Sequence, residues 1–186
     1  MPENTEIPCN AYEPRGAYSH EYFSNEVNAY ERLEERKCPH MPRYLGCYQL
    51  RFEDRGTEID YDRIVNVIML ERIKGGQLSH SIENIDEVPF DFVEKMVSWL
   101  YESLDSIHNC GVAHGLINPE KCIVQVNEDG SLRPVWTDFT LSTLMNGELD
   151  SEENLTLIDD GIGSINTIFE PTYRKNSMGI LMYICR

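Results

Sequence analysis

The chain is poor in basic residues. It holds 16 Lys and Arg against 32 Asp and Glu, which gives a net charge of -16 over 186 residues. A phosphate backbone or an anionic membrane surface repels such a chain, so we expect no nucleic acid and no membrane as partners. No apolar run approaches the roughly 18 residues that span a bilayer. The start MPENTEIPCN has no basic patch followed by an apolar core, so we expect an intracellular protein, cytoplasmic or nuclear.

Metal-binding cysteine pairs are missing as well. The six cysteines are scattered without any CxxC spacing, and the five histidines form no ligand pattern beside them. Structural zinc is therefore not expected, and in a reducing compartment most of the cysteines should be small core residues. Apolar residues make up 41% of the chain. That share is enough to bury a core, and the length predicts one domain over residues 1–186.

The first half of the chain predicts one helix and two strands. From Glu21 to Lys37, apolar residues recur at helical spacing with charges on the remaining faces. The segments RYLGCYQLRF (43–52) and RIVNVIMLER (63–72) are rich in β-branched and aromatic residues. A polar, Gly-containing segment separates them. They are expected to form two strands, a hairpin if adjacent.

The second half predicts a long helix and a further strand pair. Gly75-Gly76 should break regular structure before a short helix. Pro89 and Gly111 then bracket a segment whose apolar residues step by three and four, typical of one long helix packed along a core. CIVQV (122–126) and PVWTDF (134–139) are expected to pair as short strands.

The remaining chain begins with an acidic run. Residues 146–160 hold six acidic residues and no basic one, and we interpret them as a solvated loop. A helical turn or two is expected over residues 163–171. The acidic loop over residues 148–160 could attract a basic partner, and a solvated loop is the interpretation we prefer.

Two motifs carry a resemblance. IHNCGVAHGLINPEKCIV (107–124) is similar to a loop containing H-R-D-L-K-P-E-N, and VWTDFTLS (135–142) is similar to D-F-G-L-S. In this order, with the elements around them, the chain resembles a protein kinase-like domain of a divergent, fungal type. The resemblance implies an α+β fold with a reduced N-terminal lobe (about 1–73) and a truncated, mainly helical C-terminal lobe (74–186).

The resemblance also says which groups have been exchanged. His114 matches the loop histidine, but Leu116 occupies the place of the proton-accepting Asp. Asn118 stands where Lys is usual, and Lys121 stands where a magnesium-binding Asn is expected. Asp138 is retained, either as a vestigial magnesium ligand or as a residue that caps its own turn. Since leucine neither accepts a proton nor binds magnesium, the loop is degenerate.

The phosphate-gripping half of a kinase site is missing from the sequence. By the resemblance Glu26 would pair with a strand lysine, but the first lysine is Lys37, after Glu26, and no G-x-G-x-x-G precedes it. We therefore interpret Glu26 as a solvated helix carboxylate, with an orphaned site residue as the alternative. The resemblance places Leu70, Glu71 and Ile73 beside an adenine pocket; a buried strand leaving the core is the other interpretation.

The internal packing around the loop histidine is expected to be kept even though the catalytic groups are missing. The resemblance implies that His114, Phe139 and Tyr30 stack inside the protein. The function we expect is that of a catalytically impaired pseudokinase, which binds ATP and magnesium weakly or not at all and acts as a binding or regulatory module for a protein partner. An active phosphotransferase that uses Asp138 with Lys121 or Arg15, and a truncated copy without its own role, are the alternatives. The oligomeric state is not indicated.

Overall fold

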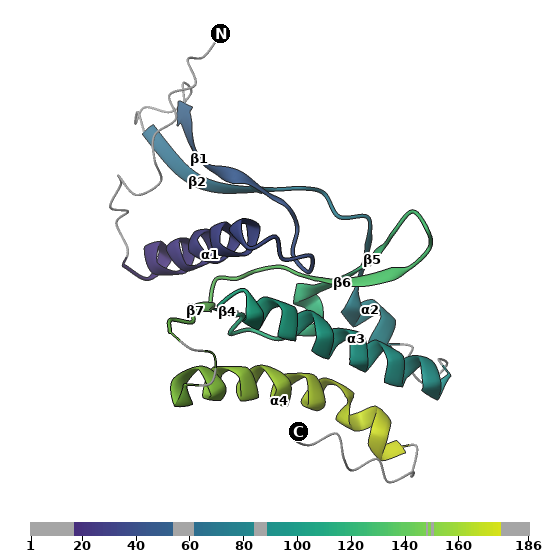
Figure 1. Cartoon of the computed structure of the whole chain (residues 1–186). Helices are drawn as coiled ribbons and strands as arrows, with labels where there is room; N and C mark the ends of the chain where they lie inside the picture. Colours follow the sequence, from purple (N-terminus) through teal and green to yellow (C-terminus); the bar gives the residue numbers. More distant parts are fainter. Residues whose placement is uncertain (1–16, 54–61, 84–88, 148, 150, 176–186) are drawn as a thin grey trace.

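The structure is a computed structural model that describes residues 17–53, 62–83, 89–147, 149 and 151–175. Within these residues it has four α-helices and three small antiparallel sheets, an α+β arrangement (Figure 1). The helices are α1 (Ala17–Glu35), α2 (Leu78–Glu83), α3 (Phe90–Asn109) and α4 (Glu152–Lys175), with a 3-10 turn, η3 (Pro119–Lys121). The strands are β1 (Tyr44–Glu53), β2 (Asp62–Leu70), β3 (Gly75–Gln77), β4 (Val112–Ala113), β5 (Cys122–Val126), β6 (Leu132–Trp136) and β7 (Thr143–Leu144).

The predicted helix and hairpin of the first half are confirmed. Helix α1 lies across the β1–β2 hairpin (Figure 1), whose strands are antiparallel with Leu50 opposite Val65. The segment expected to join the two strands lies mostly outside the described residues. After α1 the chain turns with Lys37 in the left-handed region (φ 56°), and the Cys38 N–H donates to the Leu33 carbonyl at 2.9 Å. This C-terminal cap directs the chain from the helix back toward the sheet.

The prediction that Gly75-Gly76 breaks regular structure is wrong. Gly75 begins strand β3, which pairs with β5 and places Gly76 opposite Val124. A Cβ on Gly75 would lie 2.2 Å from the Val124 carbonyl oxygen. Glycine is therefore needed here because two backbones approach closely, and the pair of glycines marks a strand contact rather than a turn. The predicted short helix follows as α2.

The predicted long helix is confirmed as α3. Pro89 precedes its first residue and Gly111, with φ 78°, follows its end. Its apolar side is buried, with Val93, Leu100, Leu104 and Ile107 each at most 1% exposed. Helix α3 thus forms the centre of the core, against which the loops after it pack.

The strand pair after α3 is confirmed, although β6 ends at Trp136 rather than Phe139. Trp136 is fully buried, and its indole N–H donates to the Ser103 hydroxyl of α3 at 2.8 Å. This bond satisfies the polar atom of a large core side chain and fixes the hairpin against the helix.

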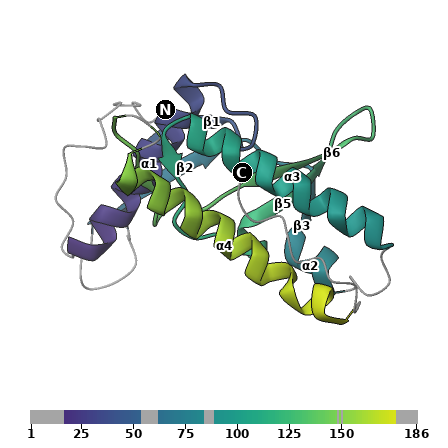
Figure 2. The same cartoon turned by 60° about the horizontal axis from the view of Figure 1, so that its bottom comes forward.

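The interpretation of residues 146–160 as a solvated loop is wrong for its second half. Helix α4 begins at Glu152 and lies along α3 (Figures 1 and 2). Glu152 and Glu153 occupy its first turn, where negative charge favours the positive end of the helix dipole. The expected helical turn over 163–171 is therefore part of a 24-residue helix that buries Ile165 and Phe169.

The cysteines follow the expectation in part. Cys38, Cys110 and Cys122 are free thiols; Cys38 and Cys122 are buried, and Cys110 is half-buried. Cys47 differs because it is disulfide-bonded. Among the residues described, no helix is both long and apolar enough to span a membrane.

Candidate functional site

The loop histidine is a buried, neutral residue. The His114 ring accepts the Leu116 N–H at Nδ1 (3.3 Å), which leaves Nε2 to donate to the Thr137 carbonyl (3.1 Å). Burial lowers the pKa of His114 to about 4, although the Thr137 hydrogen bond and the charge of Asp138 oppose the shift. At neutral pH this imidazole carries no charge. It links the loop 114–116 to the end of β6.

The expected stacking of His114, Phe139 and Tyr30 is confirmed, and we call these three residues the aromatic column. The rings of His114 and Phe139 have centroids 4.5 Å apart, and Tyr30 meets Phe139 edge-on at 5.1 Å. All three side chains are at most 1% exposed. Since Tyr30 lies on α1, the column joins the first helix to both loops.

The loop is closed against the segment after Phe139. Gly115 has φ 74°, and a Cβ there would lie 2.0 Å from the Leu141 carbonyl oxygen. Only glycine fits this backbone without a shift. The next residue, Leu116, is half-buried and has an apolar side chain at the position where the resemblance expects a proton acceptor.

The retained aspartate is neutralised by the chain itself. Lys121 Nζ lies 2.6 Å from Asp138 Oδ2, and the Thr140 hydroxyl donates to Asp138 Oδ1 at 2.6 Å. Burial raises the pKa of Asp138, but the hydrogen bonds from Lys121 and Thr140 outweigh it, so the pKa is lowered. The same bond raises the pKa of Lys121. Both carboxylate oxygens are thus engaged, and a full positive charge stands beside them.

Glu26 completes this group, which we call the ion-pair cluster: Glu26, Lys121, Asp138 and Thr140. Glu26 is half-buried, and the backbone N–H of Phe139 lowers its pKa. Burial and the charge of Asp138 raise its pKa, while Lys121 lowers it. The interpretation of Glu26 as a fully solvated carboxylate is therefore wrong, because its side chain is half-buried. The charge of Lys121 acts on it, and whether Glu26 is a site residue stays a prediction.

A buried hydroxyl faces the same cluster. Tyr30 is fully buried, and its hydroxyl has no hydrogen-bond partner among the described atoms. Burial first, and then the charge of Glu26, raise the pKa of this phenol above its usual range. The phenol is therefore neutral at every pH at which the protein is expected to work.

Asn118 has a local role in the backbone. Its side-chain oxygen accepts the Glu120 N–H at 2.9 Å and caps the 3-10 turn η3. The turn carries Lys121 at its last residue, directly before β5. The asparagine thus positions the lysine of the ion-pair cluster, which is a structural contribution of the loop.

The three residues expected beside an adenine pocket are consecutive with the end of β2. Leu70 packs against the core. Glu71 donates its N–H to the Arg43 carbonyl (3.0 Å), and its carboxylate accepts the Arg43 N–H (3.1 Å). Ile73 is half-buried. These contacts tie the chain after β2 to the chain before β1, and whether the segment binds adenine stays a prediction.

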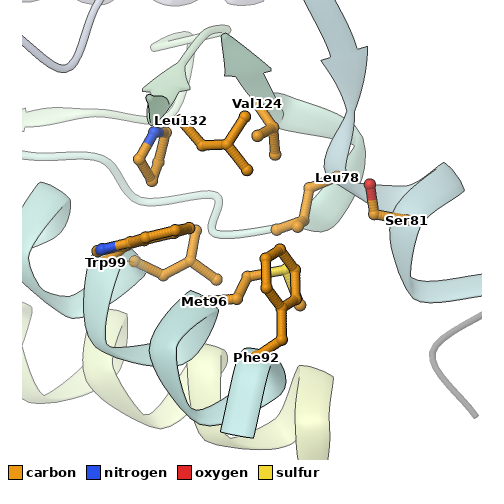
Figure 3. A pocket seen from close by; sticks show the side chains of 9 residues that line it. Leu78, Ser81, Phe92, Met96, Trp99, Val124 and Leu132 are labelled. Atoms are coloured by element: carbon orange, nitrogen blue, oxygen red, sulfur yellow. The ribbon is translucent and has the colours of Figure 1, made fainter. Parts of the chain in front are cut away.

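A separate apolar pocket lies away from these residues. It is formed by α2, α3 and the β5–β6 hairpin, and Figure 3 shows Phe92, Met96 and Trp99 facing Leu132, Val124 and Leu78. None of its lining residues belongs to the ion-pair cluster. Sequence reasoning missed it; the signal was the spacing of Phe92, Met96 and Trp99 along one side of α3.

Comparisons with known proteins find similarity over part of the chain. No family model matches. An 80-residue segment is 34% identical to CBL-interacting serine/threonine-protein kinase 16 of Arabidopsis thaliana, covering 43% of this chain and 16% of that protein. An 82-residue segment is 28% identical to serine/threonine-protein kinase DCLK1 of Rattus norvegicus, covering 44% of this chain and 19% of that protein. The matches span less than a fifth of either relative, and they indicate a region similar to serine/threonine protein kinases.

Proposed function

We propose that the chain is a catalytically impaired protein kinase-like domain that acts as a binding module. In this proposal about residues 1–73 form a reduced N-terminal lobe and residues 74–186 part of a C-terminal lobe. The partial similarity to two serine/threonine kinases supports the kinase-like assignment. These relatives come from a plant and a rat, so the fungal-type assignment stays a prediction.

The observation that carries the proposal is the ion pair between Lys121 and Asp138. Phosphoryl transfer depends on magnesium held by carboxylate and amide oxygens against the phosphates. Here an ammonium lies 2.6 Å from the carboxylate expected to hold that metal, and a threonine hydroxyl occupies its other oxygen. A dication placed there would have to displace Lys121 and would then be repelled by it.

The missing proton acceptor is a second, independent support. Leu116 cannot orient or deprotonate an attacking hydroxyl. At Gly115 the loop backbone lies close to the Leu141 carbonyl. Losing one preorganised group of this kind costs roughly 10²–10⁴ in rate. With both the proton acceptor and the metal position changed, turnover of ATP is not expected.

The partner is proposed to be another protein. The net charge of -16 opposes nucleic acid. An intracellular location, cytoplasmic or nuclear, goes with this proposal. In this proposal the buried aromatic column and the buried side of α3 hold the fold in shape, and the partner binds to the surface of that fold.

The test is nucleotide binding with and without magnesium. Calorimetric titration of ATP and of adenosine, each with and without MgCl₂, should show no gain of ATP affinity from the metal. Lys121→Met removes the ammonium and should keep the fold intact. Lys95→Met, on the exposed side of α3, is the matched control. Micromolar binding that requires magnesium in the wild type, or ATP hydrolysis, would overturn the proposal in favour of an active phosphotransferase.

A further inference from the structure

Two free thiols meet where α1 and α3 end. Cys38 lies in the turn after α1, and Cys110 is the residue that ends α3. The Cys38 thiol is one of the groups that raise the pKa of Cys110, and Cys110 packs against the core cluster that contains Cys38. The residues are 72 positions apart in sequence, so the contact is made by the fold.

Cys38 is held in place by its backbone and by α3. The capping turn that places Lys37 at φ 56° fixes the Cys38 N–H on the Leu33 carbonyl at 2.9 Å. The Cys38 sulfur lies 3.9 Å from the Ser106 hydroxyl. Ser106 is one helical turn before Cys110 on α3, so this contact places the Cys38 sulfur within about one helical turn of the second cysteine.

Cys110 is held equally well. Its N–H donates to the Ile107 carbonyl at 3.0 Å, and the following Gly111 has φ 78°. A Cβ on Gly111 would lie 3.3 Å from Arg32 Nη1, so the last turn of α1 reaches the same place. The last turn of α1 thus lies beside the end of α3, and each of these two helix ends carries one free thiol.

We propose that Cys38 and Cys110 are a redox-modifiable pair that forms a reversible disulfide tying α1 to α3. This inference goes beyond the proposed function and does not depend on kinase ancestry. A disulfide of the glutathione class is the oxidant. One protein thiolate attacks it and releases one glutathione thiol; the other protein thiolate then displaces the second. The protein loses two electrons and two protons, and the glutathione disulfide gains both.

The order of the two attacks follows from exposure. Cys110 is half-buried, whereas Cys38 is only 7% exposed. Cys110 therefore meets the external disulfide first, and Cys38 resolves the mixed disulfide from inside. Burial and the neighbouring Cys38 raise the pKa of Cys110 to about 11, although Arg36 opposes the shift. Since the thiolate is the nucleophile, oxidation should be slow at neutral pH and faster at pH 9.

The consequence falls on α1. This helix carries Glu26 of the ion-pair cluster and Tyr30 of the aromatic column. A bond from the turn after α1 to α3 closes a loop that contains the whole β1–β2 hairpin and α2. In the oxidised protein α1 cannot move away from α3, so the position of Glu26 is held.

The experiment oxidises the full chain at pH 8.5 with glutathione disulfide, followed by alkylation, digestion and mass spectrometry. We expect a peptide linking Cys38 to Cys110, while Cys122, fully buried in β5, stays alkylatable after unfolding. The melting temperature should rise by about 5–10 °C. The Cys110→Ser variant, treated identically, should show neither the link nor the rise, so any contribution from the Cys47 disulfide cancels.

Two further outcomes overturn the proposal. One is that both thiols remain reduced at equilibrium with glutathione disulfide. The other is that Cys110 stops at a mixed disulfide with glutathione or links to a cysteine other than Cys38. Ser106→Ala keeps both thiols and should still form the bond; if it does not, Ser106 rather than the meeting of the helix ends governs the reaction.

Discussion

Two neighbouring groups of side chains, each with one residue on α1 and the others in the chain after α3, differ in kind. The aromatic column is buried, apolar and joined by ring contacts of 4.5 and 5.1 Å. The ion-pair cluster is half-exposed, and in it Lys121 stands 2.6 Å from Asp138. The column is what the resemblance to kinases predicts, whereas in the cluster an ammonium stands beside the carboxylate at which that resemblance expects a metal. Buried packing and charged contacts are thus separate features of these loops, and substitutions can test each of them alone.

The physical reason lies in what each group contributes. The column is buried, so truncation of any of its three side chains opens a cavity. The cluster sits at the surface of that core, where an exchange of one polar group for another costs little stability. Experiments that measure stability and activity separately test this difference between the aromatic column and the ion-pair cluster.

The largest effect is expected from Phe139→Ala. The side chain is fully buried between His114 and Tyr30, and its removal should lower the free energy of unfolding by about 3–5 kcal/mol. Urea denaturation measures this. Leu155→Ala, at a residue 46% exposed on α4, is the control and should change it by less than about 1 kcal/mol. Equal losses in the two variants would contradict the central role of the column.

A pH effect of about 3 kcal/mol is expected from His114. Its pKa is about 4 in the folded protein against 6.5 for a free imidazole. As pH falls from about 6.5 toward 4, the unfolded chain binds a proton that the folded protein refuses, so stability declines over that range. Nuclear magnetic resonance titration of the His114 ring measures the pKa directly. Titration near 6.5 would show that the column does not bury it.

A smaller effect is expected from Gly115→Ala, with Gly130→Ala as its control. Both glycines have positive φ, 74° and 79°, but a Cβ has open space only at Gly130. The control should cost about 1–2 kcal/mol for backbone strain alone. Gly115→Ala should cost clearly more, because its Cβ meets the Leu141 carbonyl oxygen at 2.0 Å. Similar losses would mean that the loop is not closed against that carbonyl.

No effect on turnover is expected from repairing the cluster. Leu116→Asp with Lys121→Asn returns a proton acceptor and a metal ligand beside Asp138. These groups act on a phosphate that must already be held in line, and no lysine precedes Glu26 to hold it. Kinase and ATPase assays should stay at the parent's background. Turnover of about 1 s⁻¹ would mean that the catalytic defect lies in the loop of residues 107–124 alone.

Local patterns predicted most elements, and long-range contacts account for the errors. The spacing of apolar residues identified α1 and α3, and motif order identified the aromatic column. Gly75 was misread because its partner in strand β5, Gln125, is 50 residues away in the sequence. Acidic composition concealed the start of α4 at Glu152, since first-turn acids and a solvated run look alike. Glu26 was misread because the positive charge that acts on it, Lys121, is distant in sequence and lies near it only in the folded chain.

The tryptophan bond described above makes the protein its own optical reporter. The chain has two tryptophans. Trp136 is fully buried and bonded to Ser103, so its emission should be blue-shifted and insensitive to quenchers. Trp99 is half-buried at the apolar pocket beside Phe92, with the Lys95 ammonium 5.4 Å from its ring centre. A molecule that enters that pocket should alter the quenchable, red-side fluorescence, whereas loss of the core should alter the blue side.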